Sequence, residues 1–120
     1  MKNKSVAIIC GDPKSTFNEI LIKTLKKNFL KNTKFPIIII CSEKIFKKEL
    51  NKLKTKISLQ KFDNLNNLDK KKIYIIDIPL DYKNLSLNKK NLYIKKSFEV
   101  GLNLIKEKRS FALINGPISK

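Results

Sequence analysis

The sequence predicts a three-layer α/β/α fold built around a mostly parallel sheet. Short runs rich in β-branched residues alternate with longer segments whose apolar residues recur at helical spacing, and glycine, proline or aspartate follows several of these runs. Alternating strands and helices are typical of parallel sheets covered by helices on both faces. A chain of 120 residues is long enough for one domain, so we expect a single α/β segment over residues 1–120.

The first predicted unit is a buried strand from Ser5 to Cys10, followed by a loop and a helix. The first motif, Gly11-Asp12-Pro13, ends the strand because each of its residues favours a break in regular structure. Ser15 or Thr16 can cap the helix that follows. The residues of this helix expected at helical spacing on its inner face are Phe17, Ile20, Leu21, Thr24 and Leu25.

A second strand and helix follow the first. Residues Phe35 to Cys41 form a continuous apolar run suited to a strand that is covered on both faces. Ser42 can cap the next helix, which carries Phe46, Leu50 and Leu53.

Two more strands are predicted in the middle of the chain. Lys56 to Phe62 is a short third strand, and Ile73 to Ile78 is a fourth that ends at Pro79. Asp63 to Lys72 is polar and rich in asparagine, which favours an exposed connection. Asp81 to Lys90 shows no clear period.

The last predicted helix is followed by the last predicted strand. The helix is predicted from an apolar face, and the strand spans Phe111 to Ile114. In sheets of this type, ligands bind beyond the carboxyl ends of the strands. The first motif and Gly116-Pro117 both follow strands, so we expect them to converge on one crevice. The residues of the helical face are Ile94, Phe98, Gly101, Leu102 and Ile105.

The formal charge of +17 raises the question of a nucleic-acid partner. Arg109 is the only arginine, although phosphate and base recognition favour the guanidinium group, and the lysines are scattered over every segment. A/T-rich codon usage accounts for the joint abundance of Lys, Ile, Asn and Phe. We therefore expect no nucleic acid, and a lysine-rich nucleic-acid binder stays as an alternative.

Cysteine usage and hydropathy point to a protein of the cytoplasm. Cys10 and Cys41 lack CxxC spacing and each ends an apolar run, so we expect two small buried residues and neither a disulfide nor a metal pair. The longest uninterrupted apolar run, Pro36 to Cys41, is too short to cross a bilayer. We expect no membrane association.

The residue types limit the chemistry available inside this chain. It contains no histidine, which excludes a Ser-His-Asp triad, a Cys-His pair and a histidine-ligated metal. Its three glycines cannot form a GxGxxG loop or a phosphate loop. Asp12 either binds a substrate or orders its own loop, Glu19 either suits the helix dipole or faces the crevice, and Lys120 either pairs with an anionic group or is solvated.

Two separated motifs resemble one enzyme family, the 4-hydroxythreonine-4-phosphate dehydrogenases. Cys10-Gly11-Asp12-Pro13 through Asn18-Glu19-Ile20 is similar to the family's TPGDPAGIGPEI-like signature, and the second motif, Asn115-Gly116-Pro117-Ile118-Ser119-Lys120, is similar to its TGPINK-like signature. The departures are Lys14 to Asn18, where the family has Ala-Gly-Ile-Gly-Pro, and Asn115, where it has threonine. The matching residues are Gly11, Asp12, Pro13, Glu19, Ile20, Gly116, Pro117, Ile118 and Lys120.

The resemblance implies an incomplete isocitrate/isopropylmalate dehydrogenase-like fold, forming the amino-terminal part of a larger enzyme. The activity implied is NAD-dependent oxidation of 4-phosphooxy-threonine in pyridoxal phosphate (vitamin B6) biosynthesis, by a homodimer that holds a divalent metal through histidines. Those histidines and most NAD contacts would lie beyond Lys120, so we expect neither cofactor to bind tightly to this chain, no metal ligand within it, and no activity of the chain alone. The candidate substrate-binding residues are Asp12, Gly116 and Lys120, and the structural motif residues are Gly11, Pro13, Glu19 and Pro117.

Another class of function fits the same residues. A small flavodoxin-like α/β module, acting as a binding or regulatory domain without catalysis, would use the two loops as a docking site. Reading the coding frame past Lys120 distinguishes this module from the dehydrogenase, and titration with duplex at two salt concentrations tests the nucleic-acid alternative.

Overall fold

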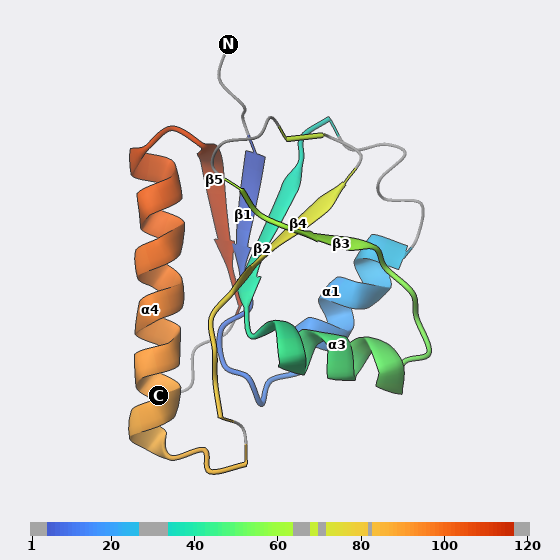
Figure 1. Ribbon diagram of the computed structural model, residues 1–120, viewed down its shortest axis with the longest axis vertical. Helices are drawn as coiled ribbons and strands as arrows, with labels where there is room; N and C mark the ends of the chain where they lie inside the picture. The colour runs from blue at the N-terminus through green and yellow to red at the C-terminus, as the bar shows by residue number, and fades with distance from the viewer. Residues whose placement is uncertain (1–4, 27–33, 64–67, 70–71, 82, 117–120) are drawn as a thin grey trace.

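The computed structural model describes residues 5–26, 34–63, 68–69, 72–81 and 83–116. Within them, strands and helices alternate along most of the chain (Figure 1). The strands are β1 (Ser5–Ile9), β2 (Ile37–Cys41), β3 (Leu59–Lys61), β4 (Ile73–Asp77) and β5 (Ser110–Asn115). The helices are α1 (Phe17–Lys26), α3 (Glu43–Lys52) and α4 (Leu87–Lys106).

All the described strand pairs are parallel, and the strand order is β3-β4-β2-β1-β5. Helices α1 and α3 lie together on one side of the sheet, whereas α4 covers the other side (Figure 1). This arrangement confirms the predicted three-layer fold with a mostly parallel sheet. The order differs from the 2-1-3-4-5 order of flavodoxin-like folds.

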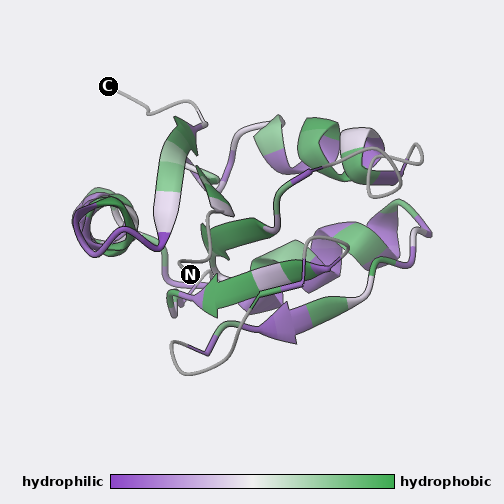
Figure 2. Ribbon diagram, turned by 90° about the horizontal axis from the view of Figure 1, so that it is seen from above, coloured by the Kyte–Doolittle hydropathy of each residue, from purple (hydrophilic) through white to green (hydrophobic). Residues whose placement is uncertain are grey.

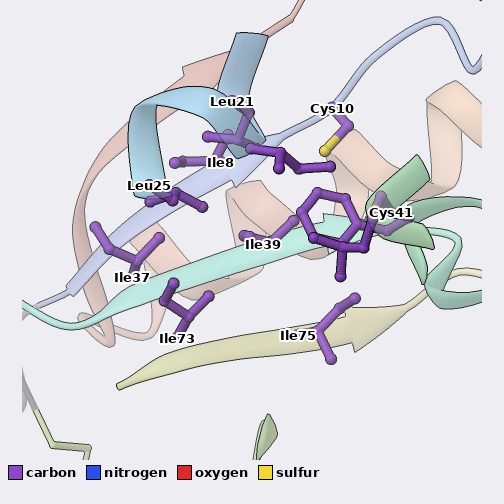
Figure 3. Close-up of a cluster of buried hydrophobic side chains, with 12 residues drawn as sticks. Ile8, Cys10, Leu21, Leu25, Ile37, Ile39, Cys41, Ile73 and Ile75 are labelled. Carbon is purple, nitrogen blue, oxygen red and sulfur yellow. The ribbon is translucent and has the colours of Figure 1, made fainter. Parts of the chain in front are cut away.

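The core consists of two apolar layers, one on each face of the sheet. Successive residues of β1 and β2 point to opposite faces, so Ile8 and Ile39 pack toward α1 and α3 (Figure 3), and Ile9 and Ile40 pack toward α4. All five residues of β2 are buried. The strands at the centre of the sheet are accordingly hydrophobic, while polar residues concentrate on helices and loops (Figure 2).

The inner faces of α1 and α4 match the sequence prediction in part, because Leu21, Leu25, Ile94 and Gly101 are buried as predicted. In α1 the buried apolar residues are Leu21, Ile22 and Leu25, whereas Ile20 is 59% exposed. In α4 the buried residues include Ile94 and Leu104, whereas Leu102 is 56% exposed. A helix with apolar residues on several sides offers more than one inner face, and packing against the sheet selects one of them.

The element boundaries also shift. Helix α4 begins at Leu87, inside the stretch that shows no clear period, and Ser86 caps it by accepting a hydrogen bond from the Lys89 amide at 3.2 Å. Strand β3 is shorter than predicted. No helix among the described residues combines the length and the apolarity that a membrane crossing requires.

Candidate functional site

The first motif and Gly116 meet at the carboxyl ends of two neighbouring strands. Strands β1 and β5 pair in parallel, with Ile9 opposite Asn115. One residue further, the Gly116 amide donates a hydrogen bond to the Ile9 carbonyl oxygen at 2.7 Å. The two strand ends therefore meet at Gly116, although Gly116 does not line the cleft that Pro13 borders. Pro117 and Lys120 lie outside the described residues.

Two glycines permit this close approach for different reasons. Gly11 has φ of 77°, a left-handed conformation that disfavours any side chain. At Gly116 the obstacle is space, because a Cβ atom would collide with the Cys10 carbonyl oxygen and would lie 2.9 Å from the Phe17 ring. Both positions lack room or freedom for a side chain, which explains why glycine occupies each.

Asp12 orders its own loop and also contacts helix α4. Its Oδ1 accepts a hydrogen bond from the Lys14 amide at 2.9 Å, and its backbone carbonyl accepts one from the Ser15 amide at 3.1 Å. Its Oδ2 lies 3.4 Å from the Lys90 ammonium nitrogen. The Asp12 side chain is 12% exposed and that of Lys90 15%, so water screens this ion pair only partly.

Lys90 is the site residue that the sequence prediction missed. It lies in the first turns of α4, far from the first motif along the chain, and no local spacing links it to Asp12. Ser86 is a capping signal that could have placed the start of α4, and with it Lys90, near the carboxyl ends of the strands.

Helix α1 begins directly after the first motif. Glu19 points into solvent and forms an ion pair with Lys23 at 2.8 Å, and this hydrogen bond lowers the pKa of the Glu19 carboxyl group. Glu19 thus lies in the first turn of α1, where the helix dipole favours a carboxylate. Asn18 is 7% exposed, and its Oδ1 has no hydrogen-bond partner among the described residues.

The neighbouring strand ends are tied together by polar side chains. The Ser42 hydroxyl caps α3 by accepting from the Ile45 amide at 3.3 Å, and the Ser42 amide donates to the Tyr93 hydroxyl at 2.7 Å. The Glu43 amide donates to the Asp77 carboxylate at 2.9 Å. The carboxylate of Asp77 thus occupies the amino terminus of α3, where the helix dipole favours negative charge.

A cleft of about 740 Å³ opens beside the first motif, and Pro13 forms part of its wall. The rest of the wall comes from α3 and from the segment between β4 and α4. A smaller cleft of about 400 Å³ lies between α4 and strands β3 and β4, and neither motif lines it. The charged residues around the larger cleft are Lys44, Lys48, Lys52, Lys83, Glu49 and Asp81.

The residue types at the site do not fit a metal or a bound dinucleotide. The chain has no histidine, and the described residues contain no group of three His, Cys, Asp or Glu side chains placed to hold an ion. The loop after β1 contains a single glycine, so it does not provide the glycine-rich backbone that approaches a pyrophosphate.

No family model and no curated protein sequence matches this chain. Solved structures do. The 4-hydroxythreonine-4-phosphate dehydrogenase of Klebsiella pneumoniae superposes with a TM-score of 0.79 at 21% identity, over 98% of this chain and 38% of its own. That of Burkholderia phymatum superposes with a TM-score of 0.72 at 16% identity, over 100% of this chain and 38% of its own.

A third structure, from Salmonella typhimurium and provisionally assigned the same enzyme name, has a TM-score of 0.79 and 22% identity over 98% of this chain. The chain spans 39% of that protein's length. At these identities the likeness establishes the fold. It agrees with the resemblance carried by the two motifs, because the solved structures with this fold bear the name of the family that the motifs indicate.

Proposed function

We propose that this α/β segment forms one wall of the substrate crevice of an NAD-dependent 4-hydroxythreonine-4-phosphate dehydrogenase in pyridoxal phosphate biosynthesis. The segment would be the amino-terminal part of that enzyme, which acts as a cytoplasmic homodimer. The observation that supports this proposal is that the first motif meets Gly116 of the second at adjacent strand ends, in a fold shared with enzymes of that name.

The residues present in this chain indicate which part of the reaction it would serve in such an enzyme. When bound, NAD accepts a hydride from the substrate. A divalent metal held by histidines needs residues from outside this chain, which contains no histidine. The contribution of this segment is therefore recognition. Its cationic and backbone groups suit a substrate that carries a phosphate, since ammonium and backbone N–H groups bind phosphate oxygens.

Each candidate substrate-binding residue has a distinct role in this proposal. Gly116 lets the end of β5 pack closely against the first motif, because it has no side chain to collide with the Cys10 carbonyl and the Phe17 ring. Asp12 holds the loop in shape and keeps lone pairs for a substrate hydroxyl or ammonium group. Lys120 pairs with the substrate phosphate. Lys90 orients the Asp12 carboxylate from the α4 side.

A chimera tests the proposal directly. This chain replaces the matching segment of the Klebsiella pneumoniae enzyme, and the formation of NADH from 4-phosphooxy-threonine is followed by absorbance. We expect metal-dependent turnover by the chimera and none by the 120-residue chain alone. Turnover by the isolated chain would contradict the inference that it serves only part of the reaction, and a folded but inactive chimera would contradict the function.

Variants of the chimera separate recognition from folding. Asp12→Asn and Lys120→Met are expected to lower kcat/KM by roughly 10- to 100-fold, because each removes a charge-assisted contact to substrate. Lys23→Met is the matched control, since Lys23 is exposed and pairs only with Glu19 among the described residues. Equal activity of all three variants would exclude Asp12 and Lys120 from the site.

A further inference from the structure

Cys10 and Cys41 lie side by side at the carboxyl ends of β1 and β2, although their sequence spacing suggested no pair. The last matched residues of the two strands are Ile9 and Ile40, and the Cys10 amide continues the ladder by donating to the Ile40 carbonyl at 3.3 Å. Cys10 is therefore opposite Cys41. In-register residues of parallel neighbours point to the same face, and both thiols belong to the apolar layer under α1 and α3 (Figure 3).

The two thiols interact within this apolar layer. A hydrogen bond with the Cys10 thiol is the main reason why the pKa of Cys41 is raised well above its usual value, and burial adds to the effect. Cys10 is 2% exposed and Cys41 is 1% exposed. No residue of the proposed substrate site needs these thiols, so the pair is a separate feature of the molecule.

Strand geometry permits a covalent bond between them. Neighbouring strands lie about 4.8 Å apart, which falls inside the Cα separations of roughly 4.4–6.8 Å that a disulfide spans. We propose that Cys10 and Cys41 form a reversible dithiol–disulfide pair that a peroxide oxidises. This inference rests on the thiol geometry and does not depend on the proposed dehydrogenase function.

The reaction balances with one peroxide. The Cys10 sulfur attacks a peroxide oxygen, the O–O bond breaks, and a sulfenic acid and one water form. The Cys41 sulfur then attacks the sulfenic sulfur and loses its proton, and the departing hydroxyl leaves as a second water. Two thiols give up two electrons, and hydrogen peroxide is reduced to two waters. An external dithiol reverses the bond by exchange.

Oxidation would act on the loop that carries the first motif. Cys10 directly precedes Gly11, and its carbonyl oxygen packs against Gly116. Cys41 directly precedes Ser42, which caps α3, and its carbonyl accepts a hydrogen bond from the Ile78 amide at 2.9 Å. A bond that draws the two sulfur atoms together therefore shifts the backbone at the carboxyl ends of β1 and β2.

Mass spectrometry of the whole chain provides the test. The purified chain is treated with hydrogen peroxide, then denatured in N-ethylmaleimide, and its intact mass is measured. Because the chain has only two cysteines, an intramolecular disulfide is unambiguous. We expect a chain that has lost two hydrogen atoms and carries no maleimide, and dithiothreitol should restore two maleimide sites. Chains that keep both thiols, or that give only dimers and over-oxidised single cysteines, would overturn the inference.

Equilibrium and structural readouts exclude chance pairing in an unfolded chain. The chain is equilibrated in mixtures of oxidised and reduced dithiothreitol. The folded chain should form the disulfide at a ratio of oxidised to reduced dithiothreitol at least about tenfold lower than the urea-unfolded chain needs, because folding raises the effective concentration of one thiol near the other. If both forms of the chain required the same ratio, the fold would not favour the disulfide and the inference would be wrong. The amide NMR signals of Gly11 and Gly116 should shift on oxidation more than that of Gly101 in α4, and Cys10→Ser and Cys41→Ser should abolish these shifts.

Discussion

The Asp12 carboxylate and the Lys90 ammonium form an ion pair at 3.4 Å that joins the loop after β1 to the start of α4. The two residues are 78 positions apart in the sequence and meet beyond the carboxyl edge of the sheet. Most of the surface of both side chains is covered, so this pair should stabilise the loop more than an exposed pair would.

A double-mutant cycle measures this contribution. Asp12→Asn keeps the acceptor for the Lys14 amide, and Lys90→Met keeps the length of the side chain. We expect a coupling free energy of about 1 kcal/mol by urea unfolding. The exposed pair Glu19 and Lys23 is the control and should show much weaker coupling. Similar coupling in the two pairs would mean that water screens Asp12 and Lys90 as well.

Substitution of Gly116 by alanine should destabilise the fold by about 2–4 kcal/mol, because the new methyl group meets the Cys10 backbone and the Phe17 ring. Gly101→Ala is the matched control. There the methyl group lies 2.9 Å from the ends of the Ile9 and Leu113 side chains, which can move, and alanine favours the helix by about 1 kcal/mol. Chemical denaturation should place Gly101→Ala within about 1 kcal/mol of the parent.

The backbone of Gly11 yields a second glycine prediction. Gly11 has a φ of 77°, which an alanine adopts only at a cost. Gly11→Ala should therefore lower the free energy of unfolding by about 1–2 kcal/mol. Gly11→Asn should cost less than Gly11→Ala, because asparagine adopts left-handed conformations more readily. An equal loss in the two variants, measured by urea titration, would show that space and not φ limits this position.

Asn18 is expected to be a site of stabilisation. It starts the inner stripe of α1, where Leu21, Ile22 and Leu25 pack on the sheet, and its buried Oδ1 has no partner among the described residues. Asn18→Leu should raise the free energy of unfolding by about 1 kcal/mol, because it removes an unsatisfied polar atom. Asn88→Leu, at an exposed position of α4, should change it by less than about 0.5 kcal/mol. Destabilisation by Asn18→Leu would indicate that the oxygen is hydrated.

The fold should lose stability at alkaline pH because of the buried hydroxyl of Tyr93. Burial raises the pKa of its hydroxyl well above the usual value of 10.0, so the folded chain holds this proton more tightly than the unfolded chain. The stability that it contributes is fully present below about pH 10 and is lost as the pH rises further. Cys41, whose pKa is also raised, acts in the same direction from a lower pH.

Tyr93→Phe separates the two effects of this hydroxyl. Near neutral pH the variant should lose about 1–2 kcal/mol, because the Ser42 amide loses its acceptor. Between about pH 10 and 11 the variant should lose less stability per pH unit than the parent, since one titrating group is gone. Thermal unfolding followed by circular dichroism across this range checks both points, and parallel pH profiles would show that Tyr93 does not titrate with unfolding.

The amino-acid pattern alone was sufficient for the fold class, for most strands and for the two motifs. The run from Ile37 to Cys41 is apolar at every position, which suits a strand covered on both faces. Each residue of Gly11-Asp12-Pro13 favours the end of regular structure. These are local properties, so a single sequence contains them.

Tertiary packing decided the rest. Which side of α1 is buried, Ile20 or Ile22, depends on contact with the sheet, because both are equally apolar. The ion pair of Asp12 with Lys90 and the adjacency of Cys10 and Cys41 depend on how the strands are ordered, which brings together residues that no spacing relates. Local preferences in the sequence specify which segments become strands. The free energy of the whole packed core determines which strands become neighbours in the sheet. The candidate site lies between such neighbours, so the sequence alone did not reveal its contacts.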